Sequence, residues 1–142
     1  MSDKQTAFAR QFIEALPHCD ALGMALETIG QGEAEIIMPY REDLIGDPET
    51  GVIHGGAVSA LLDTCAGAAV MSHPKAGLAT ATLDLRIDYM RAAKPGATIA
   101  AHAICYHMTR SVAFVRVSAN DGTSDVPVAA GTGAFTVERG KS

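Results

Sequence analysis

The second half of the chain is built on alternating apolar and polar positions. The clearest run is 81–90, where polar side chains separate apolar ones at Leu83, Leu85, Ile87 and Tyr89. A period of two puts successive side chains on opposite faces of a strand, which predicts one buried face and one polar face. By pattern and turn residues, strands are predicted at 22–29, 32–38, 81–90, 98–107, 111–119 and 128–137.

A long apolar stretch, GGAVSALLDTCAGAAVM, interrupts the strands at residues 55–71. Its length predicts a helix, and Asp63 is its single charged residue. A helix with one face in water usually carries several charges on that face. This helix is therefore expected to be buried almost all round, with Asp63 on a side that also carries the small residues Ser59, Ala60 and Gly67.

The N-terminal segment, 1–18, predicts a helix over about residues 4–16. Its large apolar side chains recur at helical spacing, at Phe8, Phe12, Ile13 and Leu16. Pro17 helps to end this helix. We expect Phe8 and Phe12 to pack against the sheet, because large apolar side chains are usually inside; contact with a substrate is the alternative.

Turn residues connect the later strands, at Pro95–Gly96 and at Asn120–Gly122, which favours antiparallel pairing. The whole chain, 1–142, has the length of a single domain. Helix, two strands, long helix and four strands give an α+β fold, in which an antiparallel sheet wraps around the long central helix. A single open sheet has edges to protect, so self-association as a homodimer or homotetramer is expected.

Charge and cysteine content narrow the range of functions. The net charge is −5 and the pI is about 5.4, so a nucleic-acid partner, which needs a basic surface, is not expected. Three cysteines without a recognisable spacing argue against a disulfide framework and favour a reducing cytoplasm. The sequence shows no apolar signal-peptide core and no run of ~18 apolar residues that would suit a membrane.

Candidate chemistry concentrates in GVIHGGAVSALLD, residues 51–63. His54, Gly55 and Gly56 open the buried helix, whose first N–H groups are unpaired and carry partial positive charge. Glycine at these positions leaves room for a ligand against the backbone. A carbonyl oxygen that gains negative charge during acyl transfer would find an oxyanion hole there. Alternatively, His54 is only a helix cap and the two glycines are only a turn.

Asp63 lies eight residues beyond Gly55, which is roughly 12 Å along a helix. That distance is too long for both residues to touch one reacting group within a single chain. A two-fold dimer would resolve the problem by placing Asp63 of one chain near Gly56 of the other. The alternatives are that Asp63 faces solvent or is paired with an arginine, since a buried carboxylate is only a statistical marker of a site.

The same stretch resembles the PaaI-like thioesterases of the hotdog superfamily. Members carry His-Gly-Gly and then a helix with an acid seven residues after the second glycine, which is the spacing from His54 to Asp63. The segment ATLDLRIDYMRAAKPG, residues 81–96, resembles the strand and turn that follow in the family, and the element order agrees over about residues 20–138. The resemblance implies a hotdog fold and an oligomeric acyl-CoA thioesterase.

By this resemblance, Asp63 is the general base or nucleophile, and the Gly56 N–H polarises the thioester carbonyl. Thr82 falls where relatives carry a serine or threonine that helps to position the attacking water. His54 orients the loop or forms a hydrogen bond with the thioester oxygen. The chain departs from the family near Asp47, because many relatives have an asparagine about six residues before the histidine.

The substrate-binding residues expected from the sequence fall into two groups. Gly55 would contact the thioester. Asp47, or alternatively Glu49, is the candidate to replace the missing asparagine, although neither supplies its amide donor. The basic residues Arg91, Lys94 and Arg110 are candidates for the phosphates of coenzyme A. Their alternative role is that of ordinary solvated surface charges.

Two other functions are open at this point. A hotdog dehydratase or hydratase of 3-hydroxyacyl thioesters pairs an acid with a histidine, and a non-catalytic acyl-CoA-binding module uses the fold without chemistry. Release of a free thiol separates hydrolysis from both. No metal and no cofactor beyond the coenzyme A of the substrate are expected. His102 and His107, five apart on one strand, are expected to face opposite sides of the sheet.

Overall fold

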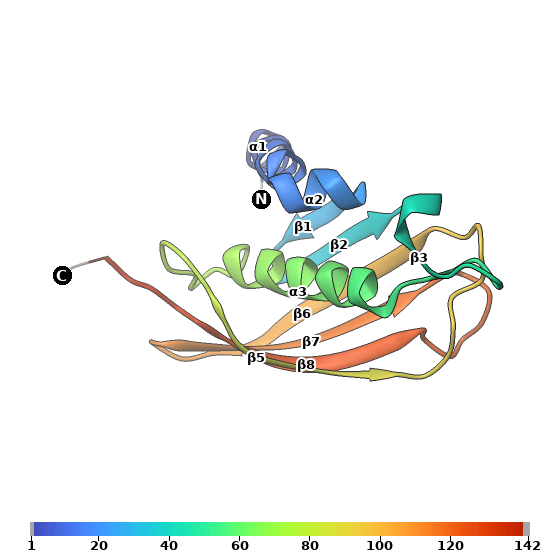
Figure 1. Ribbon diagram of the computed structural model, residues 1–142. Helices are drawn as coiled ribbons and strands as arrows, with labels where there is room; N and C mark the ends of the chain where they lie inside the picture. The colour runs from blue at the N-terminus through green and yellow to red at the C-terminus, as the bar shows by residue number, and fades with distance from the viewer. Residues whose placement is uncertain (1, 141–142) are drawn as a thin grey trace.

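The computed structural model describes residues 2–140, and Figure 1 shows a long helix lying across one face of a single large sheet. The elements run α1 (Asp3–Ala15), α2 (Pro17–Leu22), β1 (Ala25–Gly30), β2 (Glu33–Met38), a 3₁₀ turn (Glu42–Leu44), β3 (Ile45–Asp47), β4 (Val52–Ile53), α3 (Gly55–Met71), β5 (Thr82–Tyr89), β6 (Ile99–Met108), β7 (Val112–Asn120) and β8 (Ala129–Thr136).

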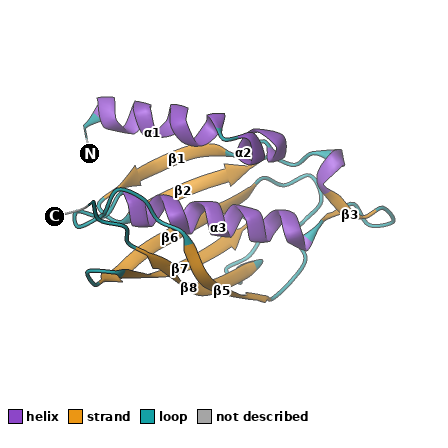
Figure 2. Ribbon diagram, turned by 60° about the vertical axis from the view of Figure 1, so that its left-hand side comes forward, coloured by secondary structure: helices purple, strands orange, loops and turns teal. Residues whose placement is uncertain are grey.

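The main sheet has six strands in the order β1-β2-β6-β7-β8-β5, and every neighbouring pair is antiparallel. β3 and β4 pair with each other in a small separate sheet. Figure 2 shows the main sheet around α3, with α1 beside β1. The predicted α+β fold, an antiparallel sheet wrapped around a long central helix, is confirmed, and it is the hotdog architecture.

The central helix has the predicted bounds and is buried as predicted. Leu61, Leu62 and Cys65 have no exposed surface. The strand residues beneath the helix are small, which lets a helix lie close to a sheet at the density of a protein interior. They are Ala101 and Ala103 of β6 and Ala113, Val115, Val117 and Ala119 of β7, all at most 3% exposed.

The first helix presents a different face to the sheet from the one expected. Ile13 is buried, whereas Phe8 and Phe12 are 70% and 60% exposed. α1 lies on the edge strand β1, and the Arg10 guanidinium donates to the Leu26 carbonyl oxygen there. The expectation that Phe8 and Phe12 pack against the sheet is therefore wrong, because the helix docks through the neighbouring stripe.

Pro17 begins a second helix, α2, where the sequence predicted only the end of the first. Proline suits the first turn of a helix, since its missing N–H would have no partner there. α2 ends at Gly23, which adopts the left-handed conformation with φ 73°. The strand predicted at 22–29 is accordingly shortened at its start to Ala25–Gly30.

β5 has the predicted alternation, but its apolar face is only partly covered. Leu85 and Ile87 pack against the core, whereas Leu83 and Tyr89 are 58% and 50% exposed. Leu83 falls in the register shift between Thr82 and Asp84, and Tyr89 lies at the other end of this edge strand. The predicted buried face is therefore confirmed only for the centre of the strand.

A bulge in β6 corrects the expectation for two histidines. The register shifts between Cys105 and His107, and an extra residue in a strand reverses the alternation of its side chains. His102 and His107 consequently share the outer face, His102 beside Glu33 and His107 stacked on Phe114. No group of three or more histidine, cysteine or acidic side chains within residues 2–140 could hold a metal ion.

The described helices also include none that is long and apolar enough to cross a membrane.

Gly131 marks a close approach of β8 to β5. A Cβ atom at this position would lie 2.4 Å from the Arg86 carbonyl oxygen, well inside van der Waals contact. Gly67 of α3 is the opposite case, since its Cβ would meet only the Phe135 ring at 4.0 Å. A methyl group at Gly131 is therefore expected to lower the free energy of unfolding, whereas one at Gly67 is not.

We predict that Gly131→Ala lowers the free energy of unfolding by about 1–3 kcal/mol, because the methyl group forces the two strands apart. Gly67→Ala is the matched control and is expected to be neutral or stabilising, since alanine is preferred to glycine within a helix by ~1 kcal/mol. Chemical denaturation of both variants measures the difference. An unchanged stability of Gly131→Ala would contradict the predicted clash.

Candidate active site

The site begins at the N-terminus of α3, where His54 is the N-cap. The Gly56 N–H donates to His54 Nδ1, with 2.8 Å between the two nitrogens. Gly46 of β3 lies directly against His54, and a Cβ there would be 2.7 Å from the His54 Cα. The small β3–β4 sheet therefore holds His54 in its capping position, and the expected alternative of a helix cap is realised in this conformation.

Gly55 and Tyr89 meet beside this cap. The Tyr89 hydroxyl donates to the Gly55 carbonyl oxygen at 2.9 Å and also forms a hydrogen bond with Ser59. The Gly55 N–H has no acceptor within residues 2–140. Sequence reasoning missed Tyr89, because its place in the alternating run predicts an apolar role and nothing in the pattern points to its hydroxyl.

Asp63 lies half-buried on the one side of α3 that the sheet does not cover. The Thr82 hydroxyl donates to Asp63 Oδ1 at 2.7 Å. Thr82 and Leu85 are three residues apart and would face opposite sides of a regular strand. A bulge between Thr82 and Asp84 puts both on the side of the sheet that faces the helix. The fold thus brings two predicted site residues, 19 positions apart, into direct contact.

The two clusters are separate within one chain. Gly56 and Asp63 are seven positions apart on the same helix, which is roughly 10 Å of helical rise. We call the group of His54, Gly55 and Gly56 the cap half-site, and the pair Asp63 and Thr82 the acid half-site. Within a single chain, the cap half-site contains the backbone N–H donors and the acid half-site contains the carboxylate.

The Asp47 side chain stabilises the turn that follows it. Its carboxylate accepts hydrogen bonds from the Thr50 hydroxyl at 2.8 Å and from the Glu49 N–H at 3.1 Å. The hydrogen bond from Thr50, followed by that from Glu49, lowers the pKa of Asp47. It is Gly46, its neighbour, that lies against His54, so the structure does not bring the Asp47 carboxylate into the cap half-site.

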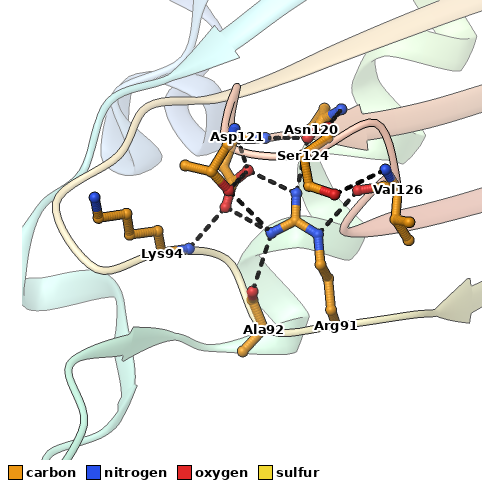
Figure 3. Close-up of polar contacts among 8 residues, drawn as sticks. Arg91, Ala92, Lys94, Asn120, Asp121, Ser124 and Val126 are labelled. Atoms are coloured by element: carbon orange, nitrogen blue, oxygen red, sulfur yellow. Dashed lines mark hydrogen bonds and ion pairs between the residues drawn. The ribbon is translucent and has the colours of Figure 1, made fainter.

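Arg91 is engaged inside the protein (Figure 3). Its guanidinium donates two hydrogen bonds to the Asp121 carboxylate, at 2.7 and 2.9 Å, and others to Asn120 Oδ1 and the Val126 carbonyl oxygen. The Asp121 side chain has no exposed surface. The bond from Arg91 holds the pKa of Asp121 well below its usual range. The guanidinium is therefore committed to protein acceptors, in contrast to the phosphate-binding role expected for it.

The other two basic candidates are differently placed. The Lys94 N–H donates to Asp121 Oδ2 at 2.8 Å, while its side chain extends away from the cluster (Figure 3). Arg110 lies in the turn between β6 and β7, where its carbonyl oxygen accepts from Arg139. Figure 1 shows this turn on the side of the C-terminus, away from the start of α3. Of the three, Lys94 has an exposed side chain on the same side as the cap half-site.

The buried cysteines are not alternative nucleophiles. Cys65 is a buried residue of α3, and its thiol donates to the Ala34 carbonyl oxygen of β2. Burial raises the pKa of Cys65 to about 12, so its reactive thiolate form is suppressed at neutral pH.

Two hollows flank the sheet. A recess of about 290 Å³ opens at the start of α3 and includes Gly55 and Tyr89 in its lining. A larger hollow of about 530 Å³ lies on the outer face, lined in part by Arg86, His102 and Arg116. The larger one shares no residue with either half-site, and both half-sites lie on the helix side of the sheet.

The chain is similar to several known proteins. The family model described as "Thioesterase superfamily" matches residues 50–128. A Halobacterium salinarum protein named "Putative esterase VNG_1336C" is 33% identical over 97% of this chain and 95% of its own length. The Escherichia coli "Medium/long-chain acyl-CoA thioesterase YigI" is 27% identical over 56% of this chain and 60% of its own.

Solved structures show the same fold. A mutant of the phenylacetic acid degradation protein PaaI from Thermus thermophilus superposes with a TM-score of 0.76 at 28% identity. The match covers 87% of this chain and 100% of that one.

We predict that Asp121→Asn lowers the free energy of unfolding at pH 7 by roughly 3 kcal/mol, because it leaves Arg91 without its counter-charge. Since folding lowers the pKa of Asp121, the ion pair stabilises fully above the ordinary carboxyl pKa of about 3.9. Its contribution is lost as the pH falls through the lowered value. The difference between wild type and variant should therefore shrink on acidification.

Urea denaturation from pH 7 to pH 3 measures this difference. Asp125→Asn is the matched control, because Asp125 is exposed in the same loop and its carboxylate makes no hydrogen bond within the described chain. Equal, pH-independent losses in the two variants would contradict the assigned role of Asp121.

Proposed function

Because the chain belongs to the thioesterase superfamily, we propose that it hydrolyses acyl-CoA thioesters to a free acid and coenzyme A. The observation that carries the proposal is the hydrogen bond from Thr82 to Asp63, the one charged residue of an otherwise buried helix. The names of two relatives, an esterase and an acyl-CoA thioesterase, support the same class of reaction.

Asp63 is the general base in this proposal. Its carboxylate takes a proton from a water molecule as the water oxygen adds to the thioester carbonyl carbon. The Thr82 hydroxyl, which donates to Oδ1, leaves Oδ2 to receive that proton and fixes the plane of the carboxylate. When the C–S bond breaks, this proton passes from Asp63 to the sulfur of coenzyme A. In the nucleophilic alternative, the Asp63 carboxylate attacks the carbonyl carbon and coenzyme A leaves as a thiolate. Water then hydrolyses the mixed anhydride to the free acid and restores Asp63.

The cap half-site stabilises the carbonyl oxygen in the proposed reaction. The Gly56 N–H already points to an acceptor outside the helix, His54 Nδ1, and the thioester oxygen would take that place. The Gly55 N–H adds a second donor at the positive end of the helix dipole. Backbone donors fixed in this way stabilise the developing negative charge without reorganising during the reaction.

Two chains would combine the half-sites. Roughly 10 Å of helix separates Gly56 from Asp63, so we infer a homodimer, or a homotetramer of two such dimers, in which the cap half-site of one chain faces the acid half-site of the other. The half-exposed side of α3 supports close approach, because it carries the small residues Ser59, Ala60 and Gly67. β5, an edge strand with exposed Leu83, adds a second surface for association.

The coenzyme A end of the substrate would be held by Lys94. Its ammonium group is exposed near the start of α3, and an ammonium binds phosphate as a point charge. Arg91 and Arg110 are left out of the proposed phosphate site, because the Arg91 guanidinium binds Asp121 and Arg110 lies in the turn between β6 and β7, away from the start of α3. No cofactor beyond the coenzyme A of the substrate is invoked, and the three buried, unpaired cysteines fit a reducing cytoplasm.

Dehydration of a 3-hydroxyacyl thioester has weaker support. Such chemistry pairs the acid with a histidine, whereas the partner of Asp63 is Thr82. Hydrolysis requires only the groups that the two half-sites contain.

We predict that Asp63→Asn lowers kcat for acyl-CoA hydrolysis by ~10²-fold or more, the usual scale for a positioned base. The assay follows free thiol with short, medium, long and aromatic acyl-CoAs. Asp88→Asn is the matched control, because Asp88 is an exposed carboxylate paired with Arg86 on the outer face of β5. It should retain wild-type turnover.

Other outcomes of this assay have separate meanings. Turnover that survives Asp63→Asn in a folded variant would keep the reaction and refute the site. Binding of acyl-CoA without thiol release by the wild type would favour the non-catalytic module.

Thr82→Val is expected to lower kcat by roughly tenfold or more, because a hydrogen bond to a charged group is worth about 1.5–3 kcal/mol. Thr82→Ser keeps the hydroxyl and should stay near the wild-type rate. Steady-state kinetics give kcat for both variants. Thr82→Val keeps the shape of the side chain without the hydroxyl, whereas Thr82→Ser keeps the hydroxyl without the methyl group. A wild-type rate in Thr82→Val, with a loss confined to Thr82→Ser, would show that the methyl group, and not the hydrogen bond to Asp63, is what matters.

A further inference from the structure

The recess at the start of α3 has an apolar floor. Its innermost side chains come from four different segments and are each at most 7% exposed: Ile53, Val58, Ala93 and Val128. Its mouth carries Tyr89 and Met90, each 50% exposed. A dry cavity of ~150 Å³ already holds benzene. The recess of about 290 Å³ therefore suits an apolar group somewhat larger than one ring or a chain of similar bulk.

This recess is continuous with the cap half-site. Gly55 lines it, and the Gly55 N–H has no acceptor in the described chain. Tyr89 borders both regions, since its ring lies 3.7 Å from the position of a Gly55 Cβ and its hydroxyl binds the Gly55 carbonyl oxygen. A carbonyl group placed at the helix N-terminus would have its apolar substituent beside this opening.

One wall of the recess is residues 90–93, a segment without regular secondary structure. Its backbone is tied to Val128, whose carbonyl oxygen accepts from the Met90 N–H at 2.9 Å and from the Arg91 N–H at 3.4 Å. Its Arg91 side chain reaches behind the wall to the buried Asp121, which also accepts from the Lys94 N–H (Figure 3). One carboxylate thus fixes the wall at two points.

A buried ion pair needs a reason beyond stability. Removing two charges from water costs about as much as their attraction returns, so such a pair is often no more stabilising than apolar side chains of similar volume. What the pair does supply is geometric specificity. A bidentate guanidinium–carboxylate contact fixes the relative orientation of the two backbone segments that carry these side chains. Here the two backbones are the recess wall and the turn after β7.

We propose that the recess receives the acyl group of the thioester, and that Arg91 and Asp121 are positioning residues that hold its wall and so limit the acyl group to short or medium length. The inference rests on the proposed thioesterase function. Neither residue touches the reacting atoms. Met90, half-exposed at the mouth, limits how far an acyl chain extends out of the recess, and the ion pair keeps Met90 in place through the adjoining backbone.

The first test changes the wall itself. Met90→Ala should raise the kcat/KM of longer acyl-CoAs relative to shorter ones by about tenfold, the scale on which apolar pockets discriminate. Met71→Ala is the matched control, because Met71 is 42% exposed at the far end of α3 and does not line the recess. It should leave the ratio unchanged. Equal ratios in wild type and Met90→Ala would overturn the proposed pocket.

The second test loosens the ion pair. Asp121→Asn and Arg91→Lys, assayed well below their unfolding temperatures, should flatten the dependence of kcat/KM on acyl length by roughly tenfold, mainly through KM. Arg91→Lys keeps the charge and loses the bidentate geometry. A purely structural role would lower activity for all substrates by one common factor. That uniform loss would overturn the positioning role of Arg91 and Asp121. The acyl pocket itself would still be tested by Met90→Ala.

Failure of the proposed function gives a different result. If wild type releases no thiol from any acyl-CoA, hydrolysis is refuted. The recess is then tested by isothermal titration calorimetry with the same acyl-CoAs. A change in the chain-length dependence of Kd in Met90→Ala, absent in Met71→Ala, supports the recess as an acyl site. Identical Kd values in wild type and Met90→Ala overturn it.

Discussion

Burial of α3 against one face of the antiparallel sheet is the constraint on which the rest of the structure depends. Small residues beneath the helix bring it close to β6 and β7, and Leu61, Leu62 and Cys65 fill the contact completely. Little of the helix surface then remains open. That remaining side is narrow, carries small side chains, and includes the only charge on the helix, Asp63, so the packing of the core determines where polar chemistry can occur.

Two polar contacts tie the edge strand to this open side. Thr82 binds Asp63 near one end of β5, and Tyr89 binds Gly55 and Ser59 near the other. Between them, Leu85 and Ile87 pack on the core. Between Tyr89 and the start of β6 the chain has no regular structure, and there the Arg91–Asp121 ion pair fixes the backbone. The backbone of this segment is therefore fixed by strand pairing as far as Tyr89 and by the Arg91–Asp121 ion pair after it.

The periodicities of the sequence determined the architecture. An apolar run of helical length with a single charge could be buried only as a central helix, and the alternating runs could only be strands with one covered face. The bounds of α3 and its burial follow from that pattern, as do the α+β class and the antiparallel pairing. The His-Gly-Gly opening and its spacing to Asp63 also pointed to the superfamily that the comparisons identify.

Tertiary structure alone decided which side chains meet. The pattern could not show that bulges in β5 and β6 turn Thr82 towards Asp63 and put His102 and His107 on one face, because a one-residue shift of register leaves the composition unchanged. It could not show that Arg91 is held by Asp121 while Lys94 remains exposed, or that α1 exposes Phe8 and Phe12. Local sequence sets the period of each element, whereas contacts between distant residues depend on how the elements are stacked, and that is a property of the whole fold.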